Sequence, residues 1–460
     1  MGACWAAAPQ RAAAQGAGAG EDAVAARAGT DTLPGTLAVR RLEGGPTVVV
    51  YPQAPEPLVA VRASFALDTA TAQAEALADI LQRLARRGME GQAAAAGGRV
   101  TLSRTPGHAV VTVTGPAGEL RALVDVIRRG VAWREPSEAE VEAARLTAAT
   151  AALATEETPE AALRLRVLAS LFPLLPTEPG AVPPRQWVTP ERLHSFWARS
   201  FRPERMQAVV VGGVSEEEAT AAFRAWPAPQ LADDGAAATD ATAGQGTPAP
   251  ARSERVPQVL FPWAAAGFPS DASPAVLAVT ARLLEGRLAA LPLRTARAEV
   301  WWQGGDRAVV LEGSAAATPS PVRAAAPIRA APPPKASRPS SARGARRVRP
   351  AAGAAPSPPP ARDTMPNPGA LLATAPREVA ALLTPAWVAE ARQSVARDIL
   401  LAGRTAEGLA GYLGELFERT GHPTAGQEFL HELEGVDAEA VGQVIDAFRS
   451  GTPVVEVVRP

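Results

Sequence analysis

The segment ALADILQRLARRG, residues 76–88, places an acid, an amide and an arginine within one turn of a predicted helix. Asp79, Gln82 and Arg83 are spaced i, i+3 and i+4, so their side chains share one face of that helix. Acid and arginine at this spacing form an ion pair, and the amide can hydrogen-bond beside it. Because a neutral amide cannot accept a proton, Gln82 cannot act as a general base.

Composition excludes several other kinds of chemistry. The single cysteine, Cys4, rules out an internal disulfide and a cysteine-based metal cage. The histidines are too far apart in the sequence for a helical two-histidine metal site; they are His108, His194, His422 and His431. A formal net charge of -1 gives no overall attraction to nucleic acid. No apolar run approaches the roughly 18 residues of a membrane-spanning helix, so we expect neither a nucleic-acid partner nor a transmembrane helix.

Residues 1–33 are rich in alanine and glycine, a composition that predicts a disordered tail. Within it, Gly2-Ala3-Cys4 resembles the end of a bacterial lipoprotein cleavage site. If translation starts upstream of Met1, Cys4 is a candidate lipid anchor and the cell envelope or periplasm is favoured. Otherwise the sequence is compatible with the cytoplasm, so the compartment stays open.

The rest of the chain alternates short strand-like and helical segments, which predicts an α+β protein. We expect a first unit at 34–230, a linker at 231–255 and a second unit at 256–460. In the first unit, two valine-rich strands precede a helix at about 72–87, and a β-hairpin turns at Pro106-Gly107. The plan of the segment that begins at Val188 recurs at Val436, and this repeat predicts two similar halves in tandem.

The segment 318–362 interrupts the second unit. It contains nine lysines and arginines and no acid, with abundant proline, alanine and serine. Such a composition predicts a disordered insert, since it offers little apolar surface to bury. Two alternatives are a basic tail that binds an acidic partner or RNA, and a frameshift in GC-rich DNA.

The order and spacing of these blocks resemble the insulinase/pitrilysin peptidases, including their mitochondrial-processing-peptidase-like bacterial members. ALADILQRLARRGM falls in register with the metal-binding helix of that family, and VTPERLHSFWARSFRPERMQAVVVGGV resembles a later block. The resemblance covers about residues 35–230 well and 256–460 more loosely. It implies two tandem homologous halves, each a mostly antiparallel sheet backed by helices.

The resemblance also identifies what is missing. Active members hold zinc with an inverted zincin motif, H-x-x-E-H, and a glutamate from a later long helix. In this chain the motif positions are Asp79, Gln82 and Arg83, and the later glutamate position falls on Ala151. Asp79 is a metal-ligand type, but the fixed positive charge of Arg83 opposes a cation beside it. The resemblance therefore implies an inactive homologue with no catalytic residue and no metal of its own.

Some proteases of this family are pairs of similar chains, of which one carries the zinc. The other chain lacks the motif and contributes to the wall that binds substrate. By analogy we expect a partner chain with an intact H-x-x-E-H motif, zinc on that partner, and a peptide substrate in a shared chamber. In LRTARAEVWW, Arg294 and Trp301 fall near the arginine and tyrosine positions of the family's substrate wall. Arginine can bind a peptide carbonyl or carboxylate, and an aromatic ring can pack beside it.

Three alternatives to these roles stay open from the sequence alone. Arg294 can simply be an exposed arginine and Trp301 a core residue. Trp302, the next residue, should point to the opposite face of the same strand, so we expect one of the two tryptophans to be exposed or at an interface. The chain can be a scaffold, as are the processing-peptidase-like core subunits of respiratory complexes. It can also be an enzyme with an unconventional metal site at Asp79.

Overall fold

The computed structural model describes most of the chain outside its low-complexity segments. The described residues are 36–53, 56–67, 72–105, 107–156, 158–172, 188–224, 226, 261–303, 305–315 and 367–458. The predicted tail with Cys4, the linker at 231–255 and the insert at 318–362 lie outside them. No helix of the described part combines the length and the apolar character needed to cross a membrane.

The first sheet has six strands in the order β1-β2-β6-β3-β5-β4. Its strands are β1 Ala38–Arg41, β2 Thr47–Pro52, β3 Leu58–Ala66, β4 Arg99–Thr105, β5 His108–Pro116 and β6 Met206–Gly212. Valine-rich runs such as TVVVYP and MQAVVVG form the central strands, because β-branched side chains pack well on a pleated surface. All neighbours are antiparallel except β2 and β6, which agrees with the predicted, mostly antiparallel sheet.

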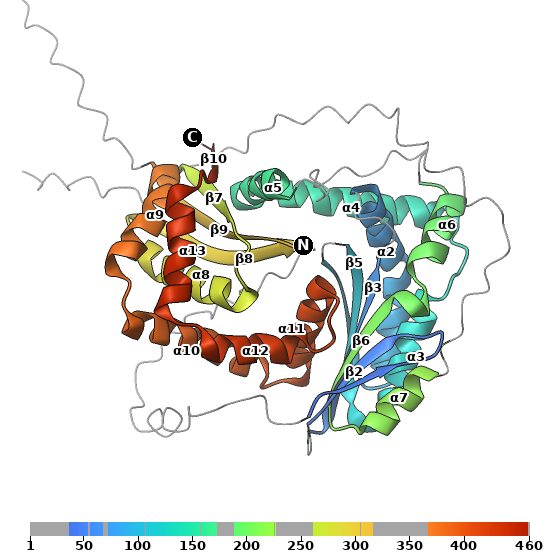
Figure 1. The fold of residues 1–460 in the computed structure, drawn as a ribbon. Coiled ribbons are helices and arrows are strands. Elements are labelled where there is room, and N and C mark those ends of the chain that lie inside the picture. Colours follow the sequence, from blue (N-terminus) through green and yellow to red (C-terminus); the bar gives the residue numbers. More distant parts are fainter. Residues whose placement is uncertain are drawn as a thin grey trace, which may run out of the picture.

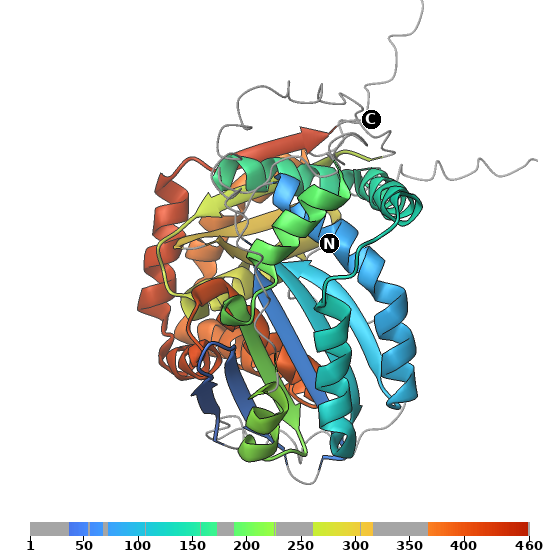
Figure 2. The same ribbon diagram turned by 90° about the vertical axis from the view of Figure 1, so that its right-hand side faces the viewer.

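Helices cover one face of this sheet, and Figure 2 shows them in front of the strands. The helices of the first half are α2 Ala72–Ala95, α3 Leu120–Val131, α4 Glu138–Glu156, α5 Pro159–Leu171, α6 Pro190–Ser200 and α7 Glu216–Arg224. The sequence also predicts where helices begin: Thr189 caps α6 by accepting from the Arg192 N–H, and Ser137 and Glu140 form a capping box before α4. One boundary differs from its prediction. Helix α2 continues to Ala95 because Met89 and Ala93 extend its buried stripe past Gly88.

The second sheet has four strands in the order β10-β7-β9-β8, all antiparallel. Its strands are β7 Trp263–Pro269, β8 Leu293–Gln303, β9 Asp306–Ala315 and β10 Val454–Val458. The helices of this half are α8 Pro274–Leu288, α9 Pro368–Leu382, α10 Pro385–Ala402, α11 Ala406–Thr420, α12 Ala425–Gly435 and α13 Ala438–Ser450. The strand order repeats β6-β3-β5-β4 of the first sheet, and α13–β10 repeats α6–β6. This repeat confirms the two similar halves predicted from Val188 and Val436.

The two halves exchange helices. Helix α5, from the first half, packs on β7, β9 and β10 of the second sheet. Helix α11, from the second half, packs on β3, β5 and β6 of the first sheet (Figure 1). One continuous apolar core accordingly joins Tyr51 and Val209 of the first sheet to Leu409 and Leu413 of α11. Each sheet is therefore covered on one side by a helix that belongs to the other half of the sequence.

Candidate functional site

The structure brings Asp79, Gln82 and Arg83 together on one face of α2, and the expected ion pair is present. Arg83 Nε donates to Asp79 Oδ2 at 2.9 Å. Arg104, on β4, places its Nε 3.8 Å from the other carboxylate oxygen of Asp79. The side chains of Asp79 and the two arginines are only 18–27% exposed. Both oxygens of Asp79 thus face an arginine, at the position where the family resemblance puts a zinc ligand.

Gln82 is buried and uses its amide to hold the β4–β5 hairpin against α2. Its Nε2 donates to the carbonyl oxygens of Ser103 at 2.9 Å and of Val110 at 3.2 Å. These two residues are partners in the register of the hairpin. Two carbonyls demand a group with two N–H donors, which an amide has and an ionised carboxylate lacks. The surroundings of position 82 therefore require a hydrogen-bond donor, whereas a general base must accept a proton.

Ala151 lies on α4, which packs against α2, and its methyl side chain offers no metal ligand. Zinc needs several lone pairs from histidine, cysteine or carboxylate groups around one point. The four motif positions supply one carboxylate, which is occupied by arginines, one amide, one cation and one methyl group. These residues do not fit a zinc ion. Within the described residues, no group of three or more histidine, cysteine, aspartate or glutamate side chains is placed to hold a metal.

The predicted substrate-binding residues lie towards opposite ends of β8, an edge strand of the second sheet. Arg294 is the extra residue of a β-bulge, is exposed, and places its guanidinium carbon 4.2 Å from the centre of the Phe261 ring. Trp301 packs on the apolar cluster formed with α5. Seven residues of extended chain separate the two by roughly 23 Å, so the structure does not bring them together. Their role in binding substrate stays a prediction.

Trp302 points to the other face of β8, as expected for adjacent strand residues. It packs against the core that α8 and α11 share, and the guanidinium carbon of Arg419 lies 5.0 Å from its ring centre. Trp301 and Trp302 thus support the two exchanged helices from opposite sides of one strand.

A buried charged cluster between α11 and the first sheet was not predicted from the sequence. Arg62 donates to both carboxylate oxygens of Glu418, from Nε at 2.8 Å and from its terminal nitrogen at 2.9 Å. Ser64 and Thr105 also donate to Glu418, the latter at 2.8 Å. The sequence feature that could have indicated this cluster is the segment LGELFERT, in which Glu415 and Glu418 interrupt an otherwise apolar helix face.

The cluster shifts the pKa values of its acids in opposite directions. Burial by itself raises the pKa of Glu418, but the charge of Arg62 and the hydrogen bonds from Arg62 and Ser64 outweigh it, so the pKa is lowered. Burial raises the pKa of Glu415, only partly offset by Arg419 and Arg62. The contacts with Arg62 and Ser64 therefore favour the ionised form of Glu418, whereas burial disfavours the ionised form of its neighbour Glu415.

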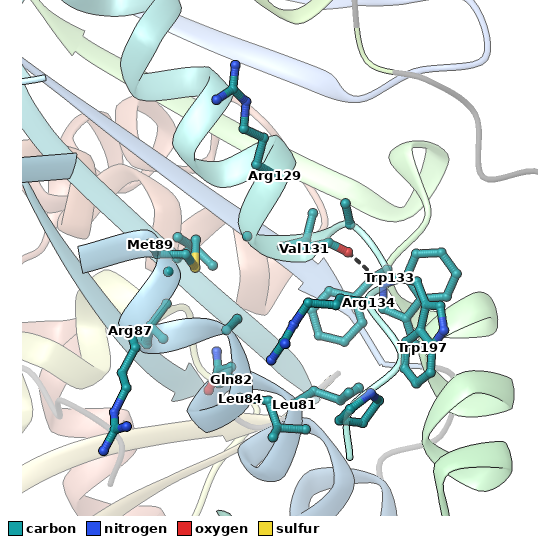
Figure 3. Close-up of a pocket in the computed structure, with 18 of the residues that line it drawn as sticks. Leu81, Gln82, Leu84, Arg87, Met89, Arg129, Val131, Trp133, Arg134 and Trp197 are labelled. Atoms are coloured by element: carbon teal, nitrogen blue, oxygen red, sulfur yellow. Dashed lines mark hydrogen bonds between the residues drawn. The ribbon is translucent and has the colours of Figure 1, made fainter. Parts of the chain in front are cut away.

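A pocket of about 310 Å³ lies beside α2 and was also not predicted (Figure 3). Gln82 lines it, but Asp79 and Arg83 do not. The pocket is bounded by α2, the β4–β5 hairpin, the segment 129–136, Glu140 at the start of α4, and the end of α6 with Phe201. Because these segments are far apart in the sequence, spacing along the chain could not reveal it.

Comparison with known proteins supports the fold. No protein-family model and no curated protein sequence matches the chain. Among solved structures, a protein described as an M16-like peptidase, from Alicyclobacillus acidocaldarius, has a TM-score of 0.61 at 14% identity and covers 93% of this chain and 98% of its own. A protease from Helicobacter pylori has a TM-score of 0.67 at 12% identity, covering 93% and 100%. A peptidase M16 inactive domain from Pseudomonas fluorescens has a TM-score of 0.61 at 12% identity, covering 92% and 97%.

These similarities extend over nearly the whole of each chain, and two of the three structures are assigned to the M16, or insulinase, class. The chain therefore has an insulinase-family, peptidase-like fold, as the resemblance in its sequence predicted. One structural neighbour is itself named an inactive domain. At this level of identity the similarity defines the fold, and the chemistry must be argued from the residues of α2.

Proposed function

We propose that this protein is a non-catalytic, peptidase-like subunit that pairs with an active zinc peptidase chain and helps to form the chamber that binds peptides. The observation that carries the proposal is the chemistry of α2. A peptidase-like helix is kept in place, while its motif positions hold an Asp79–Arg83 ion pair and a Gln82 amide bonded to two carbonyls. Fold similarity to an inactive M16 domain supports the same interpretation.

In this proposal zinc and the catalytic glutamate belong to the companion chain, which has an intact H-x-x-E-H motif. This chain contributes surface to the chamber, with Arg294 and Trp301 as candidate contacts to peptide. A paired arrangement would explain why a complete two-half fold is kept although α2 lacks a general base.

Native mass spectrometry with zinc analysis, on the protein purified from its own cells, tests the pairing. We expect a complex of about twice the mass of the chain, with one zinc bound to a companion that carries H-x-x-E-H. Recovery within a large assembly that has no proteolytic activity would instead favour a scaffold role. Recovery of the chain alone would refute the pairing.

A second experiment tests the unconventional metal site. The isolated chain is equilibrated with zinc, dialysed, and analysed for bound metal. Because two arginines face Asp79, we expect no stoichiometric zinc. One bound zinc per chain that is lost in Asp79→Ala but kept in Asp125→Ala, a matched change on the surface of α3, would show that α2 does hold a metal.

A further inference from the structure

The pocket beside α2 has the size and lining of a small-molecule site. Its volume of about 310 Å³ lies at the lower end of the range of known ligand pockets, roughly 300–1,000 Å³. Most of its lining is apolar. The apolar residues include Leu81, Leu84 and Met89 of α2, Val131 and Phe201. The volume suits one bulky apolar group with a few polar atoms attached.

Two tryptophans form a fixed wall of this pocket. The rings of Trp133 and Trp197 lie with their centres 5.6 Å apart. Trp197 donates from its indole nitrogen to the Val131 carbonyl at 2.6 Å, a bond drawn in Figure 3. His194 stacks on Trp197 at 5.8 Å. Because the indole is held by a hydrogen bond and a stacked ring, the wall is present before a ligand arrives.

Gln82 lines the pocket and has an amide oxygen that can accept a hydrogen bond. Its Nε2 donates to two backbone carbonyls, so the amide oxygen must lie on the other side of the group. None of the hydrogen bonds described for Gln82 uses this oxygen. A ligand N–H is the group that would satisfy it.

Arg134 presents donors to the same pocket. Its terminal nitrogen donates to Glu140 at 2.7 Å, which leaves further guanidinium N–H groups for a ligand. In Figure 3 its side chain extends across the pocket towards α2, whereas Arg87 and Arg129 point away. Of the three arginines that line the pocket, Arg134 is therefore the one that offers N–H donors to an anionic group of a ligand.

We propose that this pocket binds a carboxylate that carries a bulky apolar group and an adjacent N–H, as do an N-acyl amino acid and the C-terminal residue of a peptide. The carboxylate accepts hydrogen bonds from Arg134, the N–H donates to Gln82, and the apolar group packs between the tryptophans and the leucines of α2. The site lies within this chain and requires no companion, so it is independent of the proposed pairing.

Two glycines of α2 allow a matched pair of variants. A Cβ added at Gly88, which lines the pocket, meets no atom within 4 Å, and the same holds at Gly91, which does not line it. Leucine is a better helix former than glycine, so both variants should fold. Gly88→Leu would fill the pocket, and Gly91→Leu is its control.

The test is a titration of the purified chain with N-acetyl-L-phenylalanine, followed by calorimetry and by tryptophan fluorescence. We expect saturable binding that weakens about tenfold or more for the C-terminal amide of the same compound and in Arg134→Ala, because a charge-assisted hydrogen bond is lost. Binding should be lost in Gly88→Leu and kept in Gly91→Leu. A longer peptide that ends in phenylalanine distinguishes the two sources: equal affinity indicates a chain end, and weaker affinity a free N-acyl amino acid.

Absence of saturable binding by any of these probes would overturn the proposal. Binding that is unchanged in Gly88→Leu would place the ligand elsewhere and would overturn it as well. Because the isolated chain is used, neither result bears on whether a zinc-carrying companion exists.

Discussion

The two exchanged helices, α5 and α11, have equivalent positions in the fold but hold to their sheets by different chemistry. Helix α5 contacts the second sheet mainly through apolar side chains, including Leu163, Val167 and Leu168. The Arg164–Glu312 ion pair adds a polar contact, in which the side chain of Arg164 is 21% exposed and that of Glu312 10% exposed. Helix α11 instead carries Glu418 into the first sheet, where its side chain is 1% exposed and bonded to Arg62.

On the first sheet, polar side chains hold the β4–β5 hairpin between two helices. The end of the β4–β5 hairpin is held from one side by α2, through Gln82 and the Asp79–Arg104 pair, and from the other by α11, through the Thr105–Glu418 bond. The motif helix is thus connected to α11 by polar contacts that pass through one hairpin. At the second sheet, α5 is held by close apolar packing together with the Arg164–Glu312 pair.

The largest expected effect is a difference in the free energy of unfolding lost when the Arg62–Glu418 or the Arg164–Glu312 ion pair is broken. Arg62→Leu leaves Glu418 buried without its cation, and removing one partner of a buried pair costs about 3–5 kcal/mol. Arg164→Leu should cost less, about 1–3 kcal/mol, because solvent reaches the side chain of Arg164, which is 21% exposed. Urea unfolding of both variants measures the difference. Equal losses would mean that the two contacts do not differ in the way described.

A second change tests the close packing of α5. A Cβ at Gly267 of β7 would collide with the Leu171 side chain and come within 2.8 Å of Val167 Cγ1. Gly267→Ala should therefore destabilise the protein by about 1–3 kcal/mol through overpacking. Gly286→Ala on α8, where a Cβ meets nothing within 4 Å, is the control and should be neutral or stabilising. Thermal unfolding of the two variants gives the comparison.

Local features of the fold could be predicted from the sequence. The valine-rich strands, the β4–β5 hairpin and the capping of α6 each depend on neighbouring residues. The Asp79–Arg83 pair follows directly from the i,i+4 spacing of one helix. The repeat of the Val188 segment at Val436 predicted that the second half resembles the first. The family resemblance predicted that each half is a mostly antiparallel sheet backed by helices.

The remaining features depend on how distant segments pack. Gln82 could be recognised as an amide, but its carbonyl partners follow only from the register of the hairpin against α2. Arg62 and Glu418 are 356 positions apart, and no local pattern relates them. The exchange of α5 and α11 and the pocket beside α2 likewise arise from tertiary packing.

A smaller effect is expected from a change on α11 itself. A Cβ at Gly414 would approach Arg62 Nε to 2.6 Å and disturb its bidentate contact with Glu418. Gly411, on the same helix, has no neighbour within 4 Å of its Cβ position. Alanine in place of glycine favours a helix by about 1 kcal/mol. We expect Gly411→Ala to gain about that amount and Gly414→Ala to lose about 1 kcal/mol net, as measured by urea midpoints. A gain in both would show that Arg62 adjusts freely.

The smallest expected effect is the dependence of the α11 contact on pH. Because the pKa of Glu418 is lowered in the folded protein, its contribution to stability is present above the ordinary glutamate pKa and is lost as the pH falls through the folded value. The neutral amide introduced by Glu418→Gln mimics the protonated acid, so the stability difference between the wild type and this variant should shrink from pH 7 into the acid range. The control is Glu407→Gln, at the exposed pair of the same helix with Arg99. If the difference for Glu418→Gln stays constant with pH, the ionised carboxylate is not what holds α11 to the first sheet.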